Sequence, residues 1–123
     1  RRSGYVGSER VAGYVQAVRE AGFPEDRVDW VEVDDQFPES AHDQVAAVES
    51  RYAPGSRVAI VGMSDRFALA ARRAASGWRG LQLVALVGFD DIPDAAAAGL
   101  TTIRLDHFRK GALAVRVLLD RIE

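Results

Sequence analysis

The chain has 123 residues, and its 16 Lys and Arg against 18 Asp and Glu give a formal net charge of -2. This balance, with no basic run beyond Arg1-Arg2 and Arg72-Arg73, argues against nucleic-acid binding by this stretch itself. The chain contains no Cys, which excludes disulfides and thiolate metal sites, and no apolar stretch approaches the length of a membrane span. We therefore expect one soluble domain, located in the cytoplasm.

The first third of the chain predicts a strand, a helix and a second strand. Ser3–Gly7 is typical of a short strand, and apolar residues at helical spacing predict a helix that starts at Ser8 and closes at Gly22. The alternating apolar residues of Val28–Val33 predict the second strand, with Trp30 in the core.

The middle of the chain continues this alternation. Ser40, with Asp43 three residues later, fits the capping box that begins a helix. Arg57–Gly62 predicts a third strand, and Asp65–Ser76 predicts the helix that follows it. The apolar face expected for the helix after Ser40 consists of Ala41, Val45, Val48 and Tyr52.

The stretch Leu81–Asp94 is the centre of the predicted fold. The unbroken apolar run Leu83–Val87 predicts a central strand that is buried on both faces, as in a parallel sheet covered by helices. Gly88 allows another group to approach the backbone closely, and Asp90 and Asp91 follow it. The alternation of strands and helices predicts an α/β fold, a three-layer lobe around a parallel sheet.

The last part of the chain predicts an extended segment and an amphipathic helix. Leu100–Leu105 is the extended segment, and the helix starts at Asp106 or His107. Its apolar side needs a partner, either the sheet of this chain or a surface outside it.

Candidate binding residues gather at one end of the predicted sheet. In open α/β sheets, ligands bind beyond the carboxyl ends of the strands, which is where Asp90 and the pair Ser64-Asp65 lie. Arg10 would face Asp90, and guanidinium donors beside a carboxylate acceptor match a polyhydroxylated ligand. Phe37, in the loop before Ser40, could stack on a sugar ring. The alternatives are an exposed Arg10, turn-forming acids and a helix cap at Ser64 or Asp65.

Catalytic and metal-binding patterns are weak. His42 and His107 are isolated, and the segment Gly7–Gly13 lacks both the P-loop and the dinucleotide-binding pattern of glycines. The pairs Asp34-Asp35 and Asp90-Asp91 could hold Mg²⁺ as in a phospho-receiver domain, although Lys110 falls inside a predicted helix. We therefore expect a protein that is not an enzyme and that carries neither a cofactor nor a metal.

Four segments, taken together, resemble the effector-binding core of transcriptional regulators of the LacI/GalR family. They are SERVAG at 8–13, SDRFAL at 64–69, VGFDDI at 87–92 and LTTIR at 100–104. The resemblance implies a periplasmic-binding-protein-like fold of two α/β lobes, with a sugar or similar small effector in the cleft between them. By motif, the effector contacts fall on Arg10, Asp90 and the Ser64-Asp65 pair, and an aromatic residue of the loop before Ser40 stacks on the ligand.

The resemblance also implies a division of the chain and a set of partners. Residues 1–99 would form the C-terminal lobe, and residues 100–123 would form the crossover and a helix that packs on the N-terminal lobe, which is missing here. The regulator would be a homodimer that binds DNA through a helix-turn-helix outside this chain and responds to effector by closure of the lobes. Two alternatives stay open, a solute-binding protein of a sugar transporter and a Mg-dependent receiver-like domain or enzyme.

Overall fold

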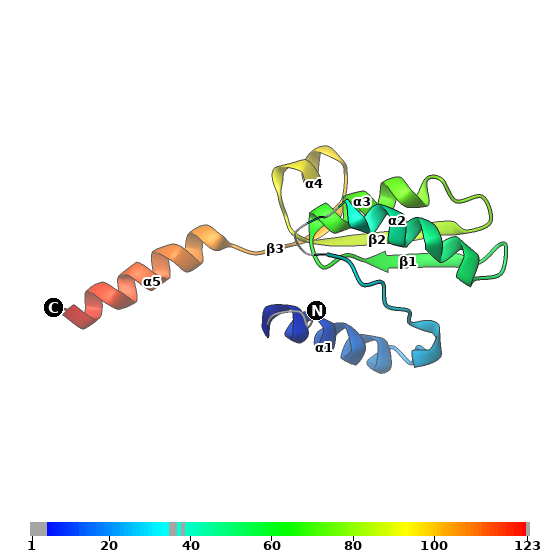
Figure 1. Ribbon diagram of the computed structural model, residues 1–123. Helices are drawn as coiled ribbons and strands as arrows, with labels where there is room; N and C mark the ends of the chain where they lie inside the picture. Colours follow the sequence, from blue (N-terminus) through cyan, green and yellow to red (C-terminus); the bar gives the residue numbers. More distant parts are fainter. Residues whose placement is uncertain (1–4, 35–36, 38, 123) are drawn as a thin grey trace.

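The computed structural model describes residues 5–34, 37 and 39–122. Three strands form a parallel sheet in the order β1-β2-β3, with helices around it (Figure 1). This confirms the predicted α/β class with a parallel sheet. The elements are α1 (Tyr5–Glu20), η1 (Glu25–Arg27), α2 (Ser40–Ala47), η2 (Val48–Arg51), β1 (Arg57–Val61), α3 (Asp65–Ala75), β2 (Gln82–Asp90), α4 (Pro93–Ala97), β3 (Thr101–Arg104) and α5 (His107–Ile122).

Strand β2 is the centre of the sheet, as its apolar run predicts, because it pairs with β1 on one side and β3 on the other. The prediction that it is buried on both faces is wrong. Helices α2 and α3 supply the buried core residues that pack with Ile60 and Leu86 on one face. On the other face, Val61 is 54 % and Val84 is 41 % exposed. The sheet is therefore covered tightly on one side, and α1 lies apart from the other (Figure 1).

The core is built mainly from small side chains of α3. Ala71 and Ala74 pack with Val45 of α2, while Ala68 packs with Ala95 of α4 and with Leu100. Small residues let the helix approach the sheet closely.

The predicted strand at Ser3–Gly7 is wrong for its described part, because Tyr5–Gly7 belongs to α1. Ser3 and Gly4 lie outside the described residues. Ser8 is consequently inside the helix and does not cap it. A short strand needs a neighbouring backbone to complete its hydrogen bonds, whereas a helix completes them within its own segment.

The predicted strand at Val28–Val33 is also wrong, since none of its residues joins the sheet. Local acceptors take amides that a strand would use. The Trp30 amide donates to the Asp29 carboxylate at 2.8 Å, and the Asp34 amide donates to Ser40 Oγ at 3.1 Å. Trp30 is 48 % exposed, so its expected place in the core is wrong as well.

Helix α2 begins without the predicted capping box. Ser40 is its first helical residue, and its Oγ accepts the Asp34 amide instead of an amide of the first turn. Asp43 is exposed beside His42. The predicted apolar face is nevertheless buried at Ala41, Val45 and Val48, whereas its fourth member, Tyr52, is 36 % exposed.

Helix α5 projects away from the sheet (Figure 1), and none of its described residues is buried. It starts at His107, within the predicted range, and the Asp106 carboxylate accepts the Arg109 amide at 2.8 Å. Phe108 is 89 % exposed. That α5 packs on a further lobe stays a prediction. Among the described residues, no helix is both long and apolar enough to cross a bilayer.

Candidate functional site

The candidate site lies where β1 and β2 end, at the carboxyl edge of the parallel sheet. The last residue of β2 is Asp90, with φ 109°, and the next is Asp91, with φ 58°. Both values fall in the left-handed region, which costs on the order of 1–3 kcal/mol per non-glycine residue unless surrounding contacts hold it. Two successive acids in this conformation mark the end of β2 as a turn that the rest of the fold maintains.

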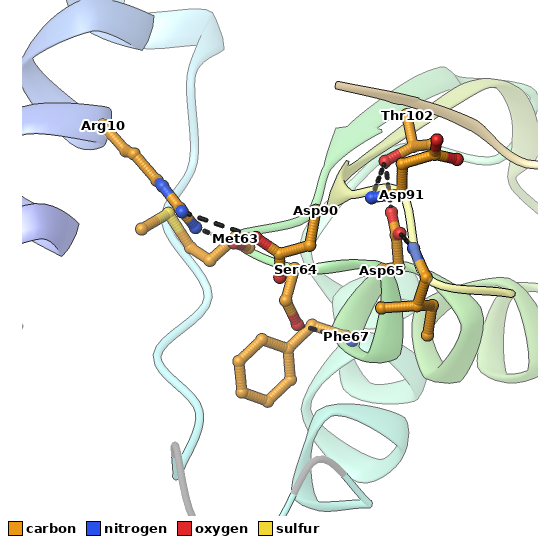
Figure 2. A network of polar contacts seen from close by, with 9 residues as sticks. Arg10, Met63, Ser64, Asp65, Phe67, Asp90, Asp91 and Thr102 are labelled. Atoms are coloured by element: carbon orange, nitrogen blue, oxygen red, sulfur yellow. Dashed lines mark hydrogen bonds and ion pairs between the residues drawn. The ribbon is translucent and has the colours of Figure 1, made fainter. Parts of the chain in front are cut away.

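Arg10 reaches this turn from α1 (Figure 2). Its Nη1 donates to the Met63 carbonyl at 2.7 Å, and its Nη2 lies 3.5 Å from Asp90 Oδ1. The guanidinium carbon is 3.9 Å from the centroid of the Phe89 ring. The side chains of Arg10 and Asp90 are 19 % and 32 % exposed, so both are partly shielded and still reachable from solvent. The structure thus brings together the two residues that the sequence places at one crevice.

The long contact in this ion pair leaves hydrogen-bond donors of Arg10 and acceptors of Asp90 available to a ligand. Charge-assisted hydrogen bonds between a guanidinium and a carboxylate are usually about 2.7–2.9 Å long, and the contact between Arg10 and Asp90 is longer at 3.5 Å. A carboxylate accepts several hydrogen bonds and a guanidinium donates up to five. Hydroxyl groups, which both donate and accept, can bind beside the pair through the donors and acceptors that it leaves free.

Ser64 and Asp65 lie just beyond β1, at the same edge of the sheet. Ser64 caps α3, because its Oγ accepts the Phe67 amide at 3.3 Å. Asp65 has no exposed surface, and its carboxylate accepts the Ile92 amide at 2.8 Å and the Thr102 hydroxyl at 2.5 Å. In this structure, the Asp65 carboxylate therefore fixes the turn after β2 from inside the fold, and a contact of Ser64 or Asp65 with a ligand stays a prediction.

The space for the Asp65 carboxylate comes from Gly88. A Cβ atom at Gly88 would overlap the Asp65 carboxylate and lie 2.9 Å from Leu100 Cδ2. The close approach predicted for this glycine is therefore present, and the group that approaches is the Asp65 side chain.

Asp91 faces the other way from Asp90, toward β3. Its amide donates to Thr102 Oγ1 at 3.2 Å, and its carboxylate accepts from Arg104 Nε at 2.6 Å. The turn after β2 is thus tied to α3 through Asp65 and to β3 through Asp91.

Phe37 is not brought to the Arg10–Asp90 pair by any contact among the described residues. Its side chain is 59 % exposed in the segment that leads to α2, where its carbonyl accepts the Ser40 amide at 2.9 Å. Exposure of an aromatic ring is compatible with stacking on a ligand, and that role stays a prediction. Trp78 packs against the core, and its Nε1 donates to the Val45 carbonyl at 3.2 Å.

Sequence reasoning missed four groups of the site. The Met63 carbonyl carries no side-chain signal, and Phe89 enters the sequence analysis only as part of the segment VGFDDI. Thr102 could not have been found from sequence alone, because its place opposite Gly88 depends on the register of β2 and β3. Tyr14 lies one helical turn after Arg10, and its hydroxyl is buried without a hydrogen-bond partner among the described residues. Burial raises the pKa of Tyr14, and the Asp90 charge adds to this while Arg10 opposes it.

The described residues include no group of three or more His, Asp or Glu side chains that could hold a metal ion. Asp35, one of the four acids considered for Mg²⁺, lies outside the described residues. His42 is exposed beside Asp43, and His107 is the first residue of α5. What the described site offers is hydrogen bonding to a polar ligand.

Comparison with known proteins gives the family of this chain. A family model described as a periplasmic binding protein-like domain matches residues 1–123. No curated protein and no solved structure matches the sequence. The matched family agrees with the parallel α/β sheet of the structure. The chain belongs to the family of periplasmic binding protein-like domains.

Proposed function

We propose that this chain binds a sugar, or a similar small polar ligand, at the Arg10–Asp90 pair, and that it is the effector-sensing part of a LacI-type transcription regulator. Membership of the periplasmic binding protein-like family supports ligand binding, and the four sequence segments that resemble LacI/GalR regulators favour the regulator. The observation that carries the proposal is the convergence of Arg10 and Asp90, from α1 and β2, at one edge of the sheet. The role is binding and not catalysis.

Each group of the site has a separate role in this proposal. Arg10 donates to ligand hydroxyls, and its hold on the Met63 carbonyl keeps the guanidinium at the site. Asp90 accepts from ligand hydroxyls. Ser64 and Phe37 add a hydroxyl contact and a stacking surface, and Asp65 supports the site from behind because its carboxylate is buried. The ligand would bridge this lobe to a second one and favour one arrangement of the two.

The partners of the regulator follow from the same proposal. DNA would be bound by a helix-turn-helix outside this chain, in a cytoplasmic homodimer whose paired DNA-binding heads change their spacing when the lobes close. The exposed apolar face of α5 is the surface that would pack on the second lobe. Sedimentation of the whole regulator at several concentrations measures the dimer.

Isothermal titration calorimetry with D-glucose, D-galactose and D-ribose tests the proposal. The Asp90→Ala variant is expected to lose about tenfold or more in affinity, because a hydrogen bond to a charged group contributes about 1.5–3 kcal/mol. Its free energy of unfolding should change by less than about 1 kcal/mol, since the carboxylate is partly exposed. Asp120→Ala, an exposed acid of α5, is the control for loss of charge. Unchanged sugar affinity in Asp90→Ala contradicts the proposal.

The family membership equally suits a solute-binding protein of a sugar transporter, which would act outside the cytoplasm. The codons upstream of Arg1 distinguish the two. A helix-turn-helix there supports the regulator, and a signal peptide supports the transport protein.

A further inference from the structure

The two adjacent acids at the end of β2 point in different directions (Figure 2). Asp90 lies beside Arg10 of α1, and Asp91 accepts from Arg104 of β3. Either carboxylate could in principle pair with either arginine, because the residues are consecutive and the charges are equal. The site requires that Asp90, rather than Asp91, faces Arg10. Some contact must therefore fix the conformation of the turn.

The hydroxyl of Thr102 links the turn to the buried Asp65 side chain. It donates to the buried Asp65 carboxylate at 2.5 Å and accepts the Asp91 amide at 3.2 Å. Asp65 also accepts the Ile92 amide at 2.8 Å. Two successive amides of the turn are therefore tied, one directly and one through Thr102, to a carboxylate with no exposed surface.

Among side chains of about the size of Thr, only one with a hydroxyl can make both hydrogen bonds at position 102. One group must donate to a carboxylate and accept from an amide at the same time, which a Ser or Thr hydroxyl does and a methyl group does not. The register of β3 sets Thr102 opposite Gly88, where the missing side chain leaves room for the Asp65 carboxylate.

We propose that Thr102 is a positioning residue for ligand binding: its hydroxyl holds the turn after β2 so that Asp90 faces Arg10 while Asp91 faces Arg104. The inference rests on the proposed function. Thr102 itself touches no ligand in this arrangement and acts through Asp90.

Three variants test the positioning role by calorimetry with D-glucose, D-galactose and D-ribose on the whole regulator, which carries both lobes. Thr102→Val keeps the shape and removes both hydrogen bonds, and it should bind the sugar about tenfold more weakly. Thr102→Ser keeps the hydroxyl and should restore affinity to within about threefold. Thr101→Val is the matched control, because Thr101 is its exposed neighbour in β3, and it should bind like the unaltered chain.

A double-mutant cycle separates positioning from a general structural effect. If Thr102 acts through Asp90, Thr102→Val should weaken binding no further in a chain that already carries Asp90→Asn. The inference is overturned if the two substitutions reduce sugar affinity by independent factors that multiply in the double variant. It is also overturned if Thr102→Val leaves sugar affinity unchanged. If the unaltered two-lobed regulator binds none of the three sugars, the proposed function is contradicted and the positioning role falls with it. Sugar binding that is equal in the unaltered chain and Thr102→Val contradicts the positioning role alone.

A second variant covers the case in which Thr102→Val does not fold. The Arg104 side chain is 79 % exposed, so Arg104→Gln should leave the fold intact while it frees the Asp91 carboxylate. The amides of Asp91 and Ile92 are still held by Thr102 and Asp65 in this variant, so sugar affinity should stay within about threefold of the unaltered protein. A loss of tenfold or more in Arg104→Gln, with recovery in Arg104→Lys, would assign the choice between the two acids to Arg104 and overturn the role of Thr102.

Discussion

The guanidinium carbon of Arg10 lies 3.9 Å from the centroid of the Phe89 ring, and the same guanidinium is 3.5 Å from the carboxylate of Asp90. Consecutive residues of a strand point to opposite faces, so one arginine would not normally contact both. The left-handed φ of 109° at Asp90 ends this alternation and turns the carboxylate back toward Arg10. Phe89 and Asp90 thus hold one cation from two directions.

Phe89→Leu should weaken the attachment of Arg10 while it preserves most apolar volume. A cation over an aromatic face contributes about 0.5–2 kcal/mol, depending on how far it is desolvated. A double-mutant cycle of Phe89→Leu with Arg10→Met, measured by urea unfolding with tryptophan fluorescence, should give a coupling free energy in that range. Phe89→Tyr keeps the ring face and serves as the control. A coupling indistinguishable from zero would show that the ring contributes shape alone.

Gly88→Ala should be among the most damaging single substitutions in the sheet. The added Cβ would overlap the Asp65 carboxylate and crowd Leu100, and overpacking of this kind costs about 1–3 kcal/mol or more. Gly111→Ala in α5 is the matched control, because nothing lies within 4 Å of its added Cβ. That change should be neutral or slightly stabilising, since Ala favours helix over Gly by about 1 kcal/mol. Equal urea midpoints for the two variants would refute the close approach at Gly88.

Glu49 should contribute to stability in a pH-dependent manner. Its carboxylate accepts the amides of Gly80 and Arg79, and these hydrogen bonds hold the pKa of Glu49 below its usual value. A carboxyl with a lowered folded-state pKa stabilises the protein above its unfolded-state pKa and loses this effect as the pH falls through the folded-state pKa. Stability of the unaltered chain should therefore fall below about pH 4.5.

Glu49→Gln should make the acid side of that profile shallower. Glu32→Gln, which replaces an exposed acid outside η2, is the control. The measurement is the free energy of unfolding from urea titrations between about pH 3 and pH 7. The prediction fails if Glu49→Gln and the unaltered chain lose stability with the same slope on acidification.

Tyr14→Phe should raise the stability of the ligand-free chain. The Tyr14 hydroxyl is buried without a partner among the described residues, and an unpaired buried hydroxyl costs about 1–3 kcal/mol. Tyr52→Phe provides the contrast, because the Tyr52 hydroxyl donates to Asp29 at 3.2 Å and its loss should lower stability slightly. Urea midpoints measure both. A lower midpoint for Tyr14→Phe would mean that the hydroxyl has a partner in solution, such as a bound water.

Local patterns predicted the parts of the fold whose signals are local. The apolar run of β2 and the serine cap of α3 both depend on neighbours in sequence, and both are present. The segment Val28–Val33 shows the limit of such patterns, because a strand needs a partner strand. Side chains of Asp29 and Ser40 instead accept the Trp30 and Asp34 amides.

Part of the candidate site could be predicted, because the topology of a parallel sheet brings the ends of its strands together. The parallel strands β1 and β2 end at one edge, which is why Ser64 and Asp90 could be placed together from sequence. The strand expected before Arg10 is instead part of α1, so the place of Arg10 beside Asp90 does not follow from strand topology. The Met63 carbonyl could not be identified, because every residue has one. Nor could the role of Thr102, which depends on the register that sets it opposite Gly88.

The separation of α5 from the rest of the chain has a consequence for spectroscopy. This helix of 16 residues has no buried residue, and an isolated helix of about that length is only marginally stable in water. Its melting is then uncoupled from that of the sheet, so far-UV ellipticity combines two processes. Trp30 and Trp78 both lie outside α5, and Trp78 packs against Val45 and Ala74. Indole emission therefore follows the sheet and its helices, while the difference between the two optical signals measures the fraying of α5 alone.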